Sequence, residues 1–466
     1  MHGIVKIVLG LTAVGVPAVI FFKRTEPSSF LPGPTSNGHH QIEKKCDACH
    51  TPFGGVAQSA CLSCHAEGME SEEDSHSPGK FEDPRNALAL GRIDAAHCVE
   101  CHREHRPAQT DRMSVSARAG FCVECHRDIG KDRSSHQGLA FNTCSDTGCH
   151  NFHDNRAVYS DFLAKHRGEP ELLPSPMVRT QSALQAAVLT ARAPAATFEP
   201  NPVADGETVK TEPPPVATAD LPPVVDQDSV GRPAITAATE GWQRSAHARA
   251  GVNCSGCHRG AGRDSGAWNW RPEPIAICAG CHADEKRTFV GGKHGMRIAV
   301  GLPPMRPADA RLPMKDEVAR DSHESGLTCN RCHDAHAPDL RTAAVDRCEG
   351  CHNDRHTRAY RQSAHFAAWQ AEIAGTKPAG SGVSCATCHM PRQLDRFGVT
   401  PRLWADHNQN ANLRPVDKMA RSVCMSCHGL QFSLNALADQ DVIAGNFAAA
   451  PRAARTGFDF LPRRSP

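Results

Sequence analysis

The chain has 466 residues, of which 22% are charged, and its formal net charge is only +1. So small a net charge gives no overall field that would attract nucleic acid or an acidic substrate, and we expect no nucleic-acid partner. Glycine (37) and proline (34) are frequent and aromatic residues make up only 5%, so the sequence is a poor candidate for a core built of protein side chains alone.

An apolar run near the amino terminus extends from Ile4 to Phe22 and is followed by Lys23 and Arg24. Its length approaches the ~20 residues with which a helix crosses a bilayer. No Ala-x-Ala cleavage site of small residues follows it. The pattern therefore favours a retained transmembrane anchor over residues 1–24, with a cleaved signal peptide as the alternative.

Pairs of cysteines followed directly by histidine recur eleven times, with two residues between the cysteines in ten copies and four in the copy at 144–150. Cys-x-x-Cys-His is the attachment motif of a c-type haem, in which both thiols add to vinyl groups and the histidine binds the iron. The copies use all 22 cysteines, so none remains for a disulfide. Zinc sites would group the pairs in twos, and redox dithiols need no histidine after each pair. The motifs therefore predict eleven covalently bound haem c groups.

The motifs fall into two clusters, numbered here in chain order. A pentahaem module over residues 39–168 holds sites 1 to 5, which are Cys46/Cys49/His50, Cys61/Cys64/His65, Cys98/Cys101/His102, Cys122/Cys125/His126 and Cys144/Cys149/His150. A hexahaem module over residues 241–445 holds sites 6 to 11, which are Cys254/Cys257/His258, Cys278/Cys281/His282, Cys329/Cys332/His333, Cys348/Cys351/His352, Cys385/Cys388/His389 and Cys424/Cys427/His428. Residues 169–240 contain neither cysteine nor histidine and are rich in proline and alanine, which predicts a linker with one short helix around residues 181–192. Residues 446–466 form a C-terminal tail.

The sixth iron ligand decides between an electron carrier and an enzyme, because an iron with a vacant position can bind a substrate. Further histidines are numerous enough to ligate every site. In the first module we expect ligands from His76, His97, His105, His136, His153, His166 and one of the adjacent His39 and His40, of which His40 is our choice. In the second module we expect them from His247, His294, His323, His336, His356, His365 and His407.

The spacing of four of these histidines indicates which haem they reach. His105, His153 and His336 follow a motif histidine by three residues, and His356 follows one by four. A side chain one helical turn away points along the same side of the chain and can reach a neighbouring haem rather than its own. Methionine could replace histidine at a site, but we expect mostly bis-histidine iron and hence low potentials.

The predicted fold is mostly α with extensive irregular loops, in two haem-cored modules with little β structure. Porphyrins would act as large, rigid core groups in place of apolar side chains. Helix is expected around residues 158–166, 358–373 and 434–443. Five porphyrins in about 130 residues, whose compact radius of gyration is roughly 14 Å, must lie close to one another. Close haem edges favour fast electron hopping.

The second module resembles the multihaem family that includes hydroxylamine oxidoreductase, pentahaem nitrite reductase and octahaem tetrathionate reductase. The likeness is clearest in the stretch from Ser381 to Arg392, around Asp406-His407-Asn408 and in the last motif. It implies distal-ligand roles for His407, His247 and His365. No motif has the lysine ligand of the nitrite reductases, and Tyr360 is the one tyrosine available for the haem cross-link of the hydroxylamine enzymes. The first module resembles the small class III cytochromes.

We interpret the chain as an electron-transfer protein. Covalent haem attachment takes place outside the bacterial cytoplasmic membrane, so we expect the periplasmic face of that membrane, although Lys23 and Arg24 then oppose the positive-inside tendency. The expected partners are a quinone-linked membrane complex and a second redox protein. One alternative is an enzyme that reduces or oxidises a small nitrogen or sulfur oxyanion at an open haem of the second module, with His356, Arg358 and Tyr360 lining a pocket. Another is a subunit of an extended haem filament.

Overall fold

A computed structural model describes most of both predicted modules. It covers residues 31–71, 76, 81–92, 94–106, 121–133, 136–137, 152–153, 160–174, 223, 225, 236–258, 272–320, 326–395, 402–413 and 416–452. Site 5, His323, the expected anchor over residues 1–24, the helix expected around 181–192 and most of the expected linker lie outside the described residues.

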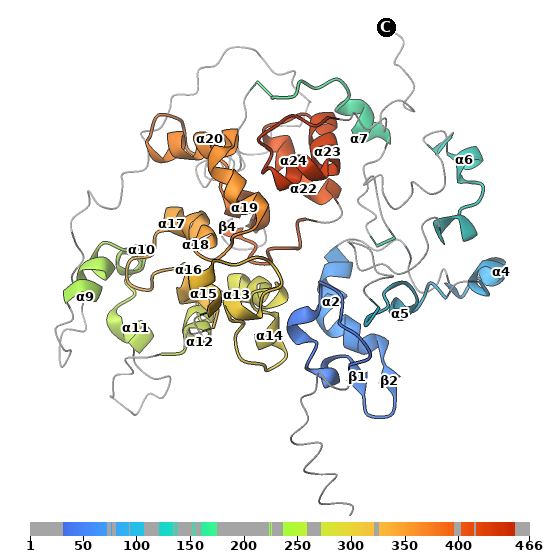
Figure 1. Ribbon diagram of the computed structural model, residues 1–466, viewed down its shortest axis with the longest axis horizontal. Coiled ribbons are helices and arrows are strands. Elements are labelled where there is room, and N and C mark those ends of the chain that lie inside the picture. Colours follow the sequence, from blue (N-terminus) through green and yellow to red (C-terminus); the bar gives the residue numbers. More distant parts are fainter. Residues whose placement is uncertain are drawn as a thin grey trace, which may run out of the picture.

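Short helices joined by long loops make up the first part of the chain (Figure 1). The elements are η2 (His40–Ile42), η3 (Cys46–Ala48), β1 (His50–Thr51), β2 (Gly55–Val56), α2 (Gln58–Ser71), η4 (Pro84–Asn86), α4 (Ala87–Leu90), α5 (Cys98–Cys101), η5 (Phe121–Glu124), α6 (Ile129–Asp132) and α7 (Ser160–Lys165).

The second part is built in the same way. Its first elements are α9 (Thr236–Gln243), α10 (Ala246–Arg249), α11 (Cys254–His258), α12 (Pro274–Ala279), α13 (Ala283–Gly291), α14 (Met296–Ala299), η9 (Pro307–Asp309), α15 (Asp316–Arg320), α16 (Cys329–Cys332) and α17 (Leu340–Ala344). They are followed by α18 (Asp346–Glu349), α19 (Arg355–Ala359), η10 (Tyr360–Gln362), α20 (Ala364–Ile373), α21 (Cys385–His389), β3 (Arg392–Asp395), β4 (Arg402–Ala405), α22 (Val416–Ser422), η11 (Cys424–Ser426), α23 (Leu430–Ala438) and α24 (Gln440–Ala444).

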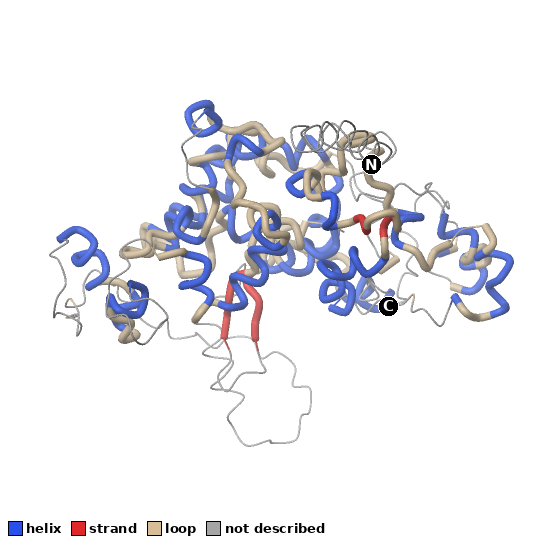
Figure 2. Tube along the Cα trace, turned by 90° about the horizontal axis from the view of Figure 1, so that it is seen from below, coloured by secondary structure: helices blue, strands red, loops and turns tan. Residues whose placement is uncertain are grey.

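The few strands form two antiparallel hairpins. β1 pairs with β2, and the longer β3 pairs with β4 in a register that sets Arg392 opposite Ala405. Figure 2 shows these red segments among blue helices and tan loops. The predicted fold class, mostly α with extensive loops and little β structure, is confirmed. The helices expected around 158–166, 358–373 and 434–443 correspond to α7, to the run from α19 to α20, and to α23 with α24.

One cluster of buried apolar side chains packs α7 against α22 and α23. It contains Leu163 of α7 together with Met419, Val423, Leu430 and Leu434. Figure 1 shows α7 beside these C-terminal helices, although they lie far from α7 in the sequence. The segment after α7 continues the contact, because the Leu173 amide donates to the Cys427 carbonyl at 2.8 Å. The first residues of the expected linker therefore belong to the packing of site 11.

The two predicted modules also contact each other directly. Arg311 forms an ion pair with Glu43 at 2.9 Å, and Arg287 of α13 pairs with Glu67 of α2. The Gln41 side chain donates to the Asp309 carbonyl at 3.0 Å. In Figure 1 the blue α2 lies beside α13 and α14. Within the part of the chain that the structure describes, no helix is long and apolar enough to cross a membrane.

Candidate haem-binding sites

Helical backbone presents the described motifs, as a short turn at most sites and within the longer helix α2 at site 2. In site 4 the amides of Cys125 and His126 both donate to the Cys122 carbonyl, at 3.3 and 2.8 Å, and the same turn recurs at other sites, including site 9. Residues i, i+3 and i+4 lie on one face of such a turn. The two thiols and the imidazole therefore point to the same side, as attachment to one porphyrin requires.

Several motif cysteines are exposed to solvent. Buried thiols would be expected if the protein enclosed each haem completely. Among the described residues the exposed ones are Cys46, Cys64, Cys125, Cys281 and Cys332. Cys64 of site 2 nevertheless lies near Cys49 of site 1, and Cys281 of site 7 lies near Cys257 of site 6. The thioether bond forms at the porphyrin edge, so the chain needs only to present the sulfur there and need not bury it.

The wide-gap motif, site 5, lies outside the described residues. Cys144 and Cys149 as attachment points and His150 as an iron ligand therefore stay predictions from the sequence. His153, three residues after His150, is described and faces site 3.

Each of the ten motif histidines that the structure describes faces one further histidine. The pairs, with the distance between ring centres, are His50–His105 at 6.4 Å, His65–His39 at 6.0 Å, His102–His153 at 6.3 Å, His126–His76 at 6.1 Å, His258–His336 at 5.9 Å, His282–His247 at 6.1 Å, His333–His407 at 6.2 Å, His352–His294 at 6.1 Å, His389–His356 at 6.2 Å and His428–His365 at 6.2 Å.

The narrow range of these distances fits an iron between the rings. A metal–imidazole bond is about 2.0–2.1 Å long and the ring centre lies about 1 Å behind the bonding nitrogen, so two axial imidazoles set their centres about 6 Å apart. Direct stacking of two rings would bring the centres closer, and unrelated surface histidines would scatter widely. The spacing at all ten sites matches that required for haem iron with two axial histidines.

Four of the facing histidines are those whose spacing from a motif points to a neighbouring haem. His105 follows site 3 but faces site 1, and His153 follows site 5 but faces site 3. His336 follows site 8 but faces site 6, and His356 follows site 9 but faces site 10. Three of these histidines thus reach a site two places earlier in the chain, and His356 reaches the next site. His247, His365 and His407, for which the family resemblance implied ligand roles, also face motif histidines.

His39, and not the adjacent His40, faces a motif histidine, His65 of site 2. His40 Nδ1 donates to the Asn37 carbonyl, 3.1 Å away, and its Nε2 accepts from the side-chain amide of Gln41 at 2.8 Å. Two other expected ligands, His97 and His166, are not among the ten pairs; His97 Nδ1 lies 2.6 Å from Asp94 and His166 Nδ1 lies 2.6 Å from Glu169. His136 does not form one of the ten pairs either.

Hydrogen bonds at Nδ1 orient several of the paired rings. Such bonds fix the tautomer and free Nε2 for a metal. His407 Nδ1 lies 2.8 Å from the Ala405 carbonyl, and His105 Nδ1 lies 2.8 Å from the Gly33 carbonyl. Burial, followed by repulsion from neighbouring histidines, lowers the pKa of His294 and that of His389 to about 4. These rings are therefore neutral at pH 7, which is the form that ligates iron.

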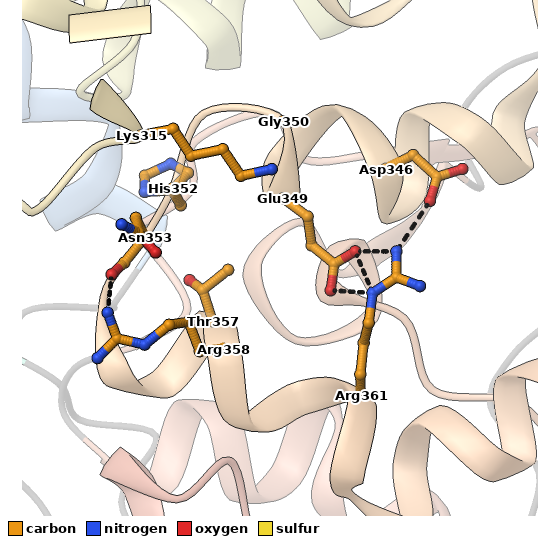
Figure 3. A pocket seen from close by; sticks show the side chains of 9 residues that line it. All are labelled: Lys315, Asp346, Glu349, Gly350, His352, Asn353, Thr357, Arg358 and Arg361. Atoms are coloured by element: carbon orange, nitrogen blue, oxygen red, sulfur yellow. Dashed lines mark hydrogen bonds and ion pairs between the residues drawn. The ribbon is translucent and has the colours of Figure 1, made fainter. Parts of the chain in front are cut away.

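An open cavity of about 500 Å³ lies against His352 of site 9 (Figure 3). Lys315 and Arg358 line it, and Figure 3 shows Arg361 bound on the opposite side by Glu349. Arg358 donates to the Asn353 carbonyl at 2.8 Å, and no carboxylate partner of Lys315 or Arg358 is found among the described residues. Asp346 and Glu349 also line the cavity, whereas His294 and the thiols of site 9 do not, so the cavity lies beside site 9 and not between its two paired rings.

Of the three residues expected to line a substrate pocket, Tyr360 and His356 are otherwise engaged, whereas Arg358 lines the cavity beside site 9. Tyr360 is 3% exposed and its hydroxyl donates to the Val383 carbonyl at 2.7 Å. His356 faces His389 and its Nδ1 is bound to the Ile443 carbonyl. All six motif rings of the second module face a second imidazole, so nothing described there corresponds to an open iron.

Adjacent sites touch in chain order. The side chains of Cys61 and Cys98 lie close together between sites 2 and 3. In the second module Cys278 lies beside Cys329 and Cys348 lies beside Cys385, which brings site 7 next to site 8 and site 9 next to site 10.

The other neighbouring sites in these parts of the chain are also close, because their cysteine side chains lie near one another. These cysteines are Cys49 and Cys61, Cys257 and Cys278, Cys332 and Cys348, and Cys388 and Cys424. Sites 1 to 3 and sites 6 to 11 thus form two continuous rows. A Phe152 ring, stacked on His76 at 4.0 Å and 5.1 Å from His153, lies between the ligand pairs of sites 4 and 3.

The motifs and their geometry define a multihaem c-type cytochrome, an electron-transfer protein with covalently bound haem c. Residues 314–399, which contain sites 8, 9 and 10, match the family model of cytochrome c3. The match lies in the second module, whereas the sequence suggested class III character for the first. The expected resemblance of the second module to the hydroxylamine oxidoreductase family finds no support in the comparisons. No curated protein and no solved structure matches the chain significantly.

Proposed function

We propose that the chain is a membrane-anchored, periplasmic undecahaem cytochrome that relays electrons between a quinone-linked membrane complex and a second redox protein. The observation that carries this proposal is the set of ten facing histidine pairs, nine of which lie along two continuous rows of sites. When bound, the haem supplies an iron that exchanges one electron while keeping both axial ligands. Paired imidazoles leave no position for a substrate, which favours conduction over catalysis.

The ligand assignment follows from the pairs. At each described site the two motif cysteines hold the porphyrin, the motif histidine binds one face and the facing histidine binds the other. At site 2 the second ligand is then His39, the neighbour of the His40 chosen from the sequence. For site 5, where His150 is the expected first ligand, the expected second ligands that remain are His97, His136, His166 and His323, because only one of His39 and His40 is expected to ligate. Its partner stays a prediction, as does the total of eleven haems.

Contacts between the two modules support a relay through the whole chain. Residues 35–43 and Glu67 dock on residues 287–311, and the η2 turn lies against α14. His39, next to this turn, faces site 2, while His294, next to α14, faces site 9. Arg287 and Arg311 hold the two ligand segments together across this contact. We therefore place the crossing between modules at sites 2 and 9.

The membrane and partner assignments rest on the sequence. The apolar run from Ile4 to Phe22 supports an anchor, and covalent haem attachment supports a periplasmic location. Site 1 begins about 24 residues after this run, so the first module is the part nearest the membrane. It would exchange electrons with the quinone-linked complex, and the second module would meet the other redox protein.

Cell fractionation with redox assays tests this proposal. We expect a haem-staining band in the membrane fraction that resists alkaline carbonate, is cut by protease in spheroplasts and becomes reduced when the quinol pool is reduced. A quinone-site inhibitor should block that reduction. A matched variant, with residues 1–24 replaced by a cleavable signal peptide, should appear in the soluble periplasm with the same haem content. A cytoplasmic location, or haems that remain oxidised beside a reduced quinol pool, would contradict the proposal.

A further inference from the structure

His39 Nδ1 is hydrogen-bonded to a carboxylate. Among the other paired rings, His282 Nδ1 has the Glu285 carboxylate nearby, but at 3.9 Å, which is beyond hydrogen-bond distance. His39 Nδ1 lies 2.7 Å from Oε1 of Glu104, a carboxylate. In the other described hydrogen bonds of paired rings, Nδ1 meets a backbone carbonyl. These rings are His76 at Phe152, His105 at Gly33, His356 at Ile443, His407 at Ala405 and His428 at Glu171.

The Glu104 carboxylate is held in place by Ser36. Oε1 accepts a hydrogen bond from the Ser36 hydroxyl at 2.7 Å, and Oε2 accepts one from the Ser36 amide at 2.6 Å. Ser36 is 5% exposed and the Glu104 side chain 26% exposed. The Ser36 hydroxyl and the His39 ring therefore share the same carboxylate oxygen in a partly buried setting.

A carboxylate hydrogen-bonded to Nδ1 changes how strongly the ring donates electrons to a metal at Nε2. It pulls the ring proton towards itself, so the imidazole gains anionic character and becomes a stronger donor at Nε2. A stronger, more negative ligand stabilises the ferric iron more than the ferrous iron and lowers the reduction potential. A backbone carbonyl, which carries no net charge, does this more weakly.

Glu104 lies in a short segment whose neighbours are ligands of three different sites. His102 is the motif ligand of site 3, and His105, whose φ of 61° lies in the left-handed region, faces His50 of site 1. The segment 102–105 thus contacts the ligand sets of sites 1, 2 and 3. Site 2 is also where the first module meets the second.

We propose that Glu104 sets the reduction potential of the haem at site 2, making it a low-potential step between the first module and the second. This inference rests on the proposed assignment of a haem with His65 and His39 to site 2. Glu104 acts through His39 and is a positioning residue. Electrons crossing between modules then pass a site whose potential is governed by one carboxylate and its serine.

Two substitutions with opposite expected signs test the proposal by spectroelectrochemical titration of the full holoprotein. Glu104→Gln keeps the shape but removes the charge, and should move one component of eleven upwards by about 59 mV, a tenfold change in its equilibrium constant. Ser36→Ala removes the donor that competes for Oε1 and should move the same component downwards. A residue with a merely structural role would move both in one direction. Glu100→Gln removes a surface charge that pairs with Arg103 and should leave that component in place.

The outcomes separate this proposal from the proposed function. Suppose both variants retain the full haem content and low-spin spectra. If the potential of this haem is then unchanged in both, or shifts in the same direction in both, the proposed role of Glu104 is wrong, while the proposed function stands. If Glu104→Gln does not fold, the downward shift in Ser36→Ala still decides. If His39→Ala opens no haem to carbon monoxide, the ligand assignment of site 2 fails, and with it the proposal.

Discussion

Replacing His294 by alanine should open one haem in the middle of the second module. The His294 ring faces His352 at 6.1 Å, beside the cavity of about 500 Å³, and no second histidine is paired with His352 among the described residues. Without its ring the iron keeps one protein ligand and becomes high-spin. One iron in eleven is about 9% of the total, which spin quantification resolves.

Carbon monoxide binding to the reduced protein measures this directly. The variant should bind one more equivalent of carbon monoxide per chain than the unchanged protein, with the same haem content by pyridine haemochrome assay. His40→Ala is the matched control, because His40 bonds to Asn37 and Gln41 and is not one of the paired rings. Equal binding by the His294 variant and the unchanged protein, at full haem content, would refute the assignment of axial ligands.

Three further results follow from the motifs and contacts described. Cys144→Ser with Cys149→Ser should lower the haem content from eleven to ten by intact mass and haemochrome assay, whereas an unchanged content would exclude a haem at site 5. Leu430→Ala removes a fully buried side chain from the cluster between α7 and α23, and should lower stability by about 2–5 kcal/mol in denaturant titrations; a cost below about 1 kcal/mol would contradict that packing. Reversing Arg287 and Arg311 to glutamate should repel Glu67 and Glu43 and enlarge the radius of gyration in X-ray scattering, with an unchanged radius arguing against the contact between modules.

The sequence was sufficient to predict the kind of site, but not how the sites are paired. A motif carries its own chemistry within a few residues, so haem attachment and the short helical turns can be read locally. Which distal ring meets which motif depends on loops that join distant sites, as His407 meets His333 across 74 residues. Spacing helped only for histidines one turn from a motif, such as His105 and His356.

Two features could not be predicted from the sequence: which of His39 and His40 faces a motif histidine, and the packing of residues 169–174 against the C-terminal helices. Adjacent His39 and His40 are equivalent by spacing, and the choice falls to Glu104, 65 residues away, which sequence analysis did not single out. Residues 169–174 look like the start of a proline-rich linker. Glu169 nevertheless accepts a hydrogen bond from the Leu430 amide at 3.1 Å, and this caps α23. Both choices are made by single tertiary hydrogen bonds that leave no periodic signal.

The electron paramagnetic resonance spectrum of the fully oxidised protein tests the central claim most directly. Ten facing histidine pairs predict that low-spin ferric signals account for at least ten of the eleven irons, about 90% of the total. A high-spin signal larger than one iron in eleven would show that a described pair does not hold its haem from both sides, and would contradict the account of this chain as a conductor of electrons.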